Sequence, residues 1–80
     1  NSNDGWIIRG IEDYPDNTVV IFNRWGDKVK ELTGYDNKDV VWDGTNTKGE
    51  VLPSGTYYYI LTIDNVGSRT GWIYLQGKEK

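Results

Sequence analysis

The carboxylates are the side chains of this 80-residue chain with the most capacity for chemistry, because it contains no His and no Cys. Two pairs lie close together in the sequence, Glu12 with Asp13 and Asp36 with Asp39. Acid–base catalysis requires a carboxyl group in an apolar setting that raises its pKa, and neither pair is embedded in such a stretch. A serine nucleophile would lack a His partner, and a domain of this size has little room for a substrate pocket. We therefore predict no catalytic residues and no enzymatic activity.

Metal binding is the second chemistry that carboxylates allow, and Asp43 in Trp42-Asp43-Gly44 is the candidate ligand. Calcium takes about six to eight oxygen ligands, so Asp4 or another loop carboxylate would have to join Asp43. The sequence lacks the spaced aspartates of a D-x-D-x-D-G loop, and without Cys and His it lacks the usual zinc ligands. The alternative is a turn in which Asp43 accepts backbone N–H groups and Gly44 adopts a conformation that other residues avoid. We predict no metal site and no cofactor.

The tyrosine triplet from Tyr57 to Tyr59 raises the question of whether aromatic side chains here bind a ligand or fill a core. Alternate residues of a strand share a face, so Tyr57 and Tyr59 lie on the side of the two aliphatic residues that end this run. We predict that this side is the core. Tyr57 also follows a Pro-x-Gly corner, as in the tyrosine corner of immunoglobulin-like sandwiches, whose hydroxyl bonds to upstream backbone. Tyr58 points to the opposite face, and we expect it to be partly exposed.

The last apolar run, 70–76, contains a second pair of outward aromatic residues. If its aliphatic residues face the core, Trp72 and Tyr74 point outward beside Tyr58. Such a cluster can stack on a sugar ring or hold a protein partner. The alternative is that Trp72 packs beneath a loop or against a missing N-terminal segment.

Charge and hydropathy narrow the class of partner. The chain has 9 Lys and Arg against 12 Asp and Glu, a net charge of −3 with both signs interspersed, whereas nucleic-acid binding requires a basic footprint. No apolar run approaches the ~20 residues of a membrane helix. Stability has to come from a hydrophobic core, to which four Trp, six Tyr and one Phe contribute.

The elements that must position these residues are short strands separated by turns. Glycine or proline recurs about every ten residues, and β-branched and aromatic residues fill the intervals. Strands are expected at 6–11, 18–25, 28–33, 40–42, 51–52, 56–63 and 70–76, with Gly26-Asp27 as a hairpin turn. This spacing predicts an all-β fold, a small immunoglobulin-like antiparallel β-sandwich of six to seven short strands. A single domain spans 1–80, with 77–80 as a solvated tail.

Four segments, taken in order, carry a resemblance to a known family: VVIFNRWGDKV (19–29), GYDN (34–37), VWDGTNTKGEVLPSGTYYYIL (41–61) and GWIYLQ (71–76). Together they resemble the gliding-motility-associated C-terminal domain, the type B sorting domain of the type IX secretion system in Bacteroidetes. The resemblance runs from Trp6 to Gln76. It implies a structural or recognition role for these motif residues: Phe22, Asn23, Arg24, Trp25, Gly26, Trp42, Asp43, Gly44, Gly55, Thr56, Tyr57, Tyr58 and Tyr59.

The resemblance implies an address rather than a catalyst. Such domains stand at the C-terminus of large secreted or surface proteins, and they direct the upstream cargo from the periplasm across the outer membrane to the cell surface or medium. The implied partners are the type IX machinery and the cargo domains of the same chain. We expect a monomer with no nucleic-acid partner and no membrane insertion. Two alternatives stay open, a carbohydrate-binding module with Tyr58, Trp72 and Tyr74 as a planar strip, and a generic adhesin-type immunoglobulin-like module.

One departure from the family concerns the start of the chain. Family members usually begin with Pro-Asn-Gly-Asp-Gly-x-Asn-Asp, whereas only NSNDGW stands before the first expected strand. We therefore expect the N-terminal motif to be truncated. An unpaired strand edge left without this segment would favour aggregation.

Arg24 is the member of the Phe-Asn-Arg-Trp-Gly box that we single out for recognition. We expect it in an apolar strand next to Trp25, where a guanidinium can stack on a ring or pair with a carboxylate. Structural stacking and partner recognition are both open. The candidate exposed recognition face comprises Arg24, Tyr58, Trp72 and Tyr74.

Overall fold

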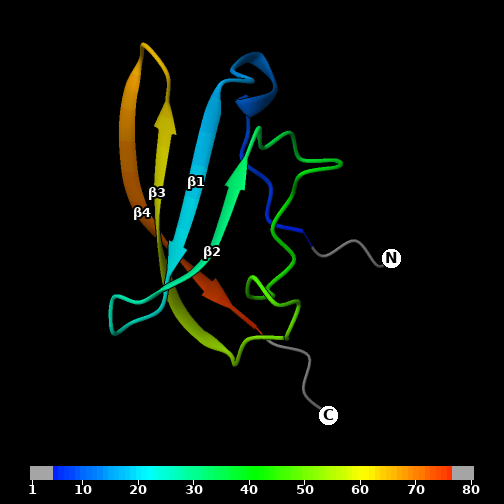
Figure 1. The fold of residues 1–80 in the computed structure, drawn as a ribbon, viewed down its shortest axis with the longest axis vertical. Coiled ribbons are helices and arrows are strands. Elements are labelled where there is room, and N and C mark those ends of the chain that lie inside the picture. Colours follow the sequence, from blue (N-terminus) through cyan, green and yellow to red (C-terminus); the bar gives the residue numbers. More distant parts are fainter. Residues whose placement is uncertain (1–4, 77–80) are drawn as a thin grey trace.

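Four strands of the chain form one antiparallel sheet (Figure 1). The computed structural model describes residues 5–76. Within them the strands are β1 (Asn17–Phe22), β2 (Lys28–Thr33), β3 (Gly55–Ile63) and β4 (Gly67–Leu75), in the order β2-β1-β3-β4. A 3-10 helix, η1 (Ile11–Asp13), precedes them, and the described residues contain no helix long and apolar enough to cross a membrane. The all-β class and four of the expected strands are confirmed.

The other expected strands are irregular in the structure. The segments 5–16 and 34–54 lie on one side of the sheet (Figure 1), and within them an isolated bridge between Thr45 and Val51 is the one β-like feature. Left-handed residues such as Gly10 and Asn37 interrupt both segments before a ladder can extend. The prediction of six to seven strands in a two-sheet sandwich is therefore not confirmed. We call these two segments the irregular layer.

The hydrophobic core lies between the sheet and the irregular layer. Along β1, residues 17, 19 and 21 are buried and the residues between them are half-buried. On β3, Tyr57 and Leu61 are buried as the alternation predicts, and Tyr59 and Ile63 pack against them. The buried apolar residues form one cluster, composed of Ile11, Val19, Ile21, Leu32, Tyr35, Trp42, Tyr57 and Leu61.

Tyr35 joins separate parts of the irregular layer from within the core. Its side chain is 1% exposed. The hydroxyl donates a hydrogen bond to the carbonyl oxygen of Trp6 and accepts the N–H of Trp42 at 2.8 Å. The ring of Tyr35 also meets the ring of Trp6 edge-on, with centroids 5.8 Å apart. One side chain thus satisfies backbone groups that a β-ladder would otherwise pair.

Two asparagines fasten the rest of the irregular layer. Asn17 is 2% exposed, and its amide donates to the carbonyl oxygens of Tyr14 and Tyr35 while its oxygen accepts the N–H of Tyr35 at 2.8 Å. Asn37 accepts the N–H of Ile8 and donates to the carbonyl oxygen of Ile8, each at 2.8 Å. Buried polar groups destabilise a fold unless they are hydrogen-bonded. These side-chain bonds pair backbone groups of the irregular layer, so the layer can cover the sheet without forming strands of its own.

We predict that ionisation of Tyr35 destabilises the fold at alkaline pH. Burial raises the pKa of Tyr35 to about 12, above the value of about 10 for a tyrosine in an unfolded chain. The stability that the neutral hydroxyl contributes is complete below pH ~10 and is lost as the pH rises toward ~12. The urea midpoint should therefore fall between these pH values, and it should fall less steeply in Tyr35→Phe. If the urea midpoints of the original domain and of Tyr35→Phe fell equally with pH, the loss of stability would not come from ionisation of Tyr35.

Candidate recognition surface

The face of the sheet opposite the core is aromatic, and the irregular layer does not cover it. Directly paired residues share a face, and the register places Phe22 of β1, Tyr58 of β3 and Trp72 of β4 in one row. Tyr58 is 46% exposed and Trp72 is 66% exposed. Tyr74, farther along β4, is 60% exposed. We call this surface the open face and define it by Val20, Phe22, Tyr58, Ile60, Trp72 and Tyr74.

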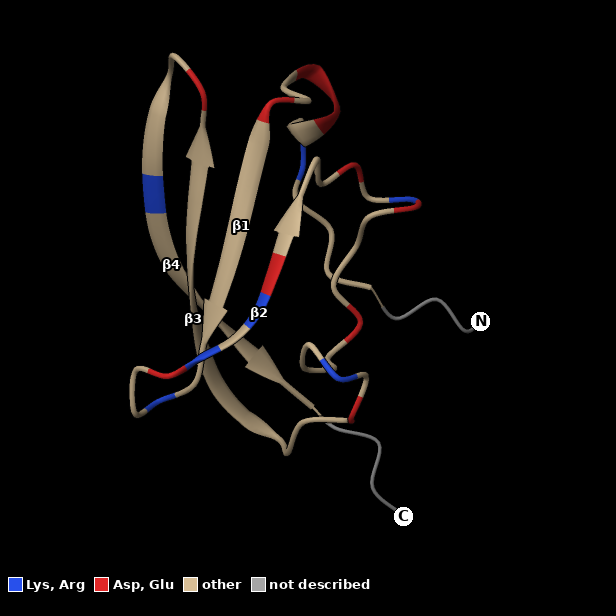
Figure 2. Ribbon diagram, viewed as in Figure 1, with Lys and Arg blue, Asp and Glu red and all other residues tan. Residues whose placement is uncertain are grey.

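A groove of about 560 Å³ runs over this row, lined in part by Phe22, Tyr58 and Trp72. β1 and β3 carry no charged residue, and β4 carries one, Arg69 (Figure 2). Arg69 pairs with a core residue of β3 and therefore lies on the other face. The open face is thus uncharged on β1, β3 and β4, whereas Lys28 and Glu31 of β2 lie on the same side of the sheet beside Phe22 and Val20. An exposed aromatic surface of this kind is typical of a site that binds a partner protein.

The Phe-Asn-Arg-Trp-Gly box ends β1 and forms the hairpin loop to β2. The side-chain oxygen of Asn23 accepts the N–H groups of Trp25 and Asp27, both at 2.9 Å, and Gly26 has φ 88°. The expected strand 18–25 was therefore too long, and Gly26-Asp27 is not a two-residue turn. Because the N–H groups of Trp25 and Asp27 bond to the Asn23 side chain, they do not take part in the hydrogen-bond ladder between β1 and β2.

Arg24 and Trp25 protrude together from this loop. The guanidinium carbon of Arg24 lies 4.7 Å from the centroid of the Trp25 ring, and Trp25 is 73% exposed. Of the two arrangements left open for Arg24, the structure shows stacking on a ring, whereas the expected position of Arg24 within a strand was wrong. Arg24 also lines the groove of the open face, so the pair lies at the end of that surface.

A second loop in the chain has the same structure as the hairpin loop. In Asn-Thr-Lys-Gly-Glu (46–50), the side-chain oxygen of Asn46 accepts the N–H groups two and four residues later at 2.9 Å, and Gly49 has φ 84°. The backbone N–H of Asn46 donates to the carbonyl oxygen of Glu50. In the hairpin loop, the backbone N–H of Asn23 donates in the same way to the carbonyl oxygen of Asp27. The two loops share the asparagine and the glycine, whereas Thr and Lys stand in the second loop where the first has Arg and Trp. The shared N-x-x-G-[D/E] pattern was visible in the sequence and was missed.

Trp42, Asp43 and Gly44 form a turn that closes the core. Trp42 is 2% exposed, and its Nε1–H donates to the carbonyl oxygen of Thr45 at 2.9 Å. Asp43 accepts the hydroxyl of Thr45 at 2.7 Å, and this bond holds the pKa of Asp43 below its ordinary value. Gly44 has φ 88°, and a Cβ there would lie 3.1 Å from a methyl carbon of Leu75. The motif therefore has a structural explanation without a ligand.

The calcium alternative for Asp43 requires further carboxylates nearby. Within residues 5–76, no group of three or more acidic side chains is placed to hold a metal ion. Asp4, the other candidate ligand, lies outside the described residues. Asp43 instead uses its oxygen within the turn.

The motif at the start of β3 is also explained by packing. The Tyr57 hydroxyl donates to the carbonyl oxygen of Pro53 at 2.8 Å, which confirms the bond expected from a tyrosine corner. Gly55 has φ 152°, a value that favours glycine, and Thr56 pairs with β4. Tyr59 lies on the core side, where a Cβ at Gly71 would collide with its ring. These residues build the domain, and Tyr58 is the member of the triplet that belongs to the open face.

Comparison with known families identifies the family of the chain. The family model of the CHU_C type IX secretion signal domain matches residues 1–75. No curated protein and no solved structure matches the chain at a significant level. The family match includes the hairpin loop, the Trp-Asp-Gly turn and the tyrosine strand. The chain therefore belongs to the family of CHU_C type IX secretion signal domains.

Proposed function

We propose that this domain is the address of a larger protein, which the type IX secretion system recognises after the protein has reached the periplasm and exports to the cell surface or medium. Membership of the secretion-signal family is the observation that carries this proposal. The family does not favour the carbohydrate-binding or adhesin alternatives. The partners are the secretion machinery and the cargo domains attached to this domain.

Three carboxyl groups are held in their charged form, which does not fit the role of a general acid. Glu12, Asp36 and Asp43 all have a pKa below the ordinary range. Hydrogen bonds from an amide side chain, a backbone N–H and a hydroxyl, respectively, stabilise their charged forms. A general acid requires the opposite shift.

We further propose that the secretion machinery reads the open face together with Arg24 and Trp25; we call this combined area the recognition surface. Trp, Tyr and Arg side chains are enriched among the residues that contribute most of the binding energy at protein interfaces. The loop comparison supports a role for Arg24 and Trp25 outside the fold, since the loop at 46–50 has the same structure with Thr and Lys in their place.

Export of a reporter tests the address function. The domain is fused to the C-terminus of a fluorescent protein that carries a Sec signal peptide, and the fusion is expressed in a type IX-competent bacterium and in a mutant without the system. We expect fluorescence outside the cells of the first strain only. If the folded fusion stayed in the periplasm of both strains, the proposed function would be contradicted.

The double variant Arg24→Thr/Trp25→Lys gives the hairpin loop the central residues of the loop at 46–50. We expect the melting temperature to stay within about 2 °C, because the turn keeps its asparagine and glycine. Export should fall about tenfold or more, since ~1.4 kcal/mol of lost binding energy is a factor of ten.

The matched control makes the reciprocal change, Thr47→Arg/Lys48→Trp, in the second loop. The same residue types then change at a site outside the recognition surface, and we expect export to be unchanged. Equal export from both double variants and the original domain would show that Arg24 and Trp25 are not read.

A further inference from the structure

The two edges of the sheet differ in how the chain protects them. At the β2 edge, the carbonyl oxygen of Val29 accepts the N–H of Thr47 at 3.0 Å, and Lys30 reaches over to the carbonyl oxygen of Asn46. At the opposite edge, β4 pairs with β3 along all nine of its residues. Within residues 5–76, no backbone bond covers the other side of β4.

Alternate N–H and C=O groups of β4 face outward from the sheet. Asp64 donates its N–H to the carbonyl oxygen of Asp16 at 2.9 Å, so even-numbered residues at this end of the ladder bond toward β1. Because antiparallel bonding alternates, odd-numbered residues of β3 bond toward β4, and the register pairs them with odd-numbered residues of β4. The backbone groups that point outward belong to Ser68, Thr70, Trp72 and Tyr74.

β4 lacks most of the features that normally limit strand addition, and its one charged residue, Arg69, lies on the core side of the sheet. Edge strands are commonly protected by Pro, Lys, inward charges or a bulge. β4 contains no Pro, Lys, Asp or Glu, and its register with β3 is unbroken. Its even-numbered residues present bare backbone groups beside the aromatic side chains of the open face.

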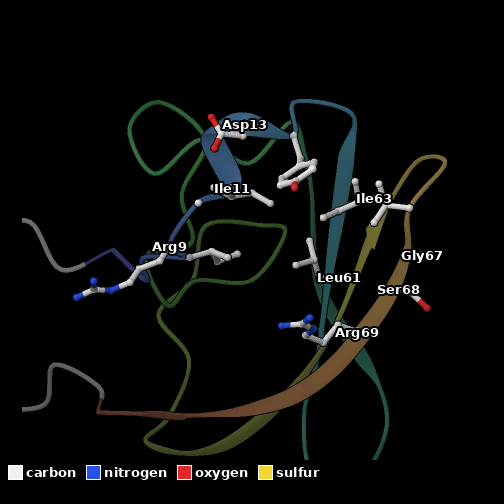
Figure 3. Close-up of a pocket in the computed structure, with 12 residues that line it drawn as sticks. Arg9, Ile11, Asp13, Leu61, Ile63, Gly67, Ser68 and Arg69 are labelled. Carbon is white, nitrogen blue, oxygen red and sulfur yellow. The ribbon is translucent and has the colours of Figure 1, made fainter.

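A second hollow lies on the core side of β4, near the β3–β4 hairpin. Its volume is about 560 Å³, and Ile11, Leu61 and Ile63 supply apolar lining. In Figure 3 the guanidinium of Arg69 points into this hollow, whereas the side chain of Arg9 extends away from it. Arg69 has no ion-pair partner within residues 5–76, although Asp13 also lines the hollow, so a carboxylate placed here from outside can pair with the Arg69 guanidinium.

We propose that β4 receives an extended strand from the recognition protein of the secretion system. The added strand bonds to the outward groups of β4 and alternates its side chains. One set packs beside Trp72 and Tyr74 on the open face, and the other enters the hollow with an acidic residue opposite Arg69. This inference rests on the proposed function, and it specifies how the partner binds.

A second copy of the chain fits this edge less well. In an antiparallel β4–β4 pair centred on Gly71, Arg69 would lie opposite Ile73 of the other copy. β4 contains no Asp or Glu, so neither Arg69 would gain a carboxylate from the partner strand. Charge complementarity therefore favours an acidic strand from another protein.

The test compares Thr70→Pro with Thr70→Ala in the reporter fusion. Proline removes an outward N–H and is tolerated on an edge strand, so the bonds between β3 and β4 remain. We expect Thr70→Pro to fold, as judged by circular dichroism, and to lose export at least tenfold, while Thr70→Ala is exported normally. In a second pair, Arg69→Glu should lose export at least fivefold and Arg9→Glu should retain it.

The outcomes separate this inference from the proposed function. If the unaltered domain is not exported, the proposed function fails. If the unaltered domain, folded Thr70→Pro and Arg69→Glu are all exported equally, the added strand is overturned while the address function stands. Should Thr70→Pro fail to fold, the Arg69→Glu and Arg9→Glu pair decides alone. If size-exclusion chromatography shows a dimer of the purified domain that Thr70→Pro abolishes, a second copy occupies the edge and the inference is overturned.

Discussion

Trp42→Ala is expected to lower the free energy of unfolding by about 4 kcal/mol, the middle of the range for removal of a buried aromatic side chain. Trp42 is 2% exposed, and its ring packs edge-on against Tyr57 with centroids 5.9 Å apart. Its Nε1–H also holds the turn at Thr45. A domain of 80 residues has ~4–12 kcal/mol of stability in total, so this loss would leave a large unfolded population. Urea unfolding followed by far-ultraviolet circular dichroism measures it.

Trp72→Ala is the matched control, because it removes the same side chain from an exposed position. Trp72 is 66% exposed, so we expect a change of less than ~0.5 kcal/mol in stability. Export should nevertheless fall, since Trp72 belongs to the recognition surface. A large loss of stability in Trp72→Ala, or a small one in Trp42→Ala, would contradict the division into core and open face.

The sheet was predictable because its strands alternate in a simple way. In β3, the positions of Tyr57 and Tyr59 on the aliphatic side identified the core face, and Tyr58 was correctly placed outside. The outward direction of Trp72 and Tyr74 followed from the same rule. What alternation cannot give is the register, and it is the register that brings β1, β3 and β4 residues into one aromatic row.

The irregular layer was not predictable from local sequence, because long-range side-chain bonds hold it. The Tyr35 hydroxyl reaches Trp6, and the Asn37 amide reaches Ile8, in each case across 29 positions of the chain. Residues 6–11 contain the β-branched and aromatic residues of a strand, but these bonds fix them in another conformation. Tertiary contacts override strand propensity in such segments.

The hairpin loop shows a different limit of sequence reasoning. Val19 to Trp25 is an apolar run broken by Asn23 and Arg24, and hydropathy alone extends the strand through it. The decisive signal is the side-chain oxygen of Asn23, which binds two N–H groups and ends the strand at Phe22. Recognition of the N-x-x-G pattern, rather than hydropathy, would have placed Arg24 and Trp25 in an exposed loop.

Tyr35→Phe is expected to lower the free energy of unfolding by about 2–4 kcal/mol, although it removes only one oxygen atom. The hydroxyl accepts the N–H of Trp42 and donates to the carbonyl oxygen of Trp6, so its loss leaves two backbone groups without their partner. Each buried group left unpaired costs about 1–3 kcal/mol. Urea unfolding at neutral pH, where the hydroxyl is un-ionised, measures the loss directly.

Tyr57→Phe supplies the comparison that separates this linking role from the general value of a tyrosine hydroxyl. The Tyr57 hydroxyl makes one bond, to Pro53, four residues away in the chain, and we expect its removal to cost about 1 kcal/mol. The two residues are both buried, so a difference between the variants reports on the bonds that each hydroxyl makes. Equal losses would mean that Tyr35 does not join the segments of the irregular layer. A loss two to three times larger in Tyr35→Phe would mean that the two bonds of this single hydroxyl hold the irregular layer over the core.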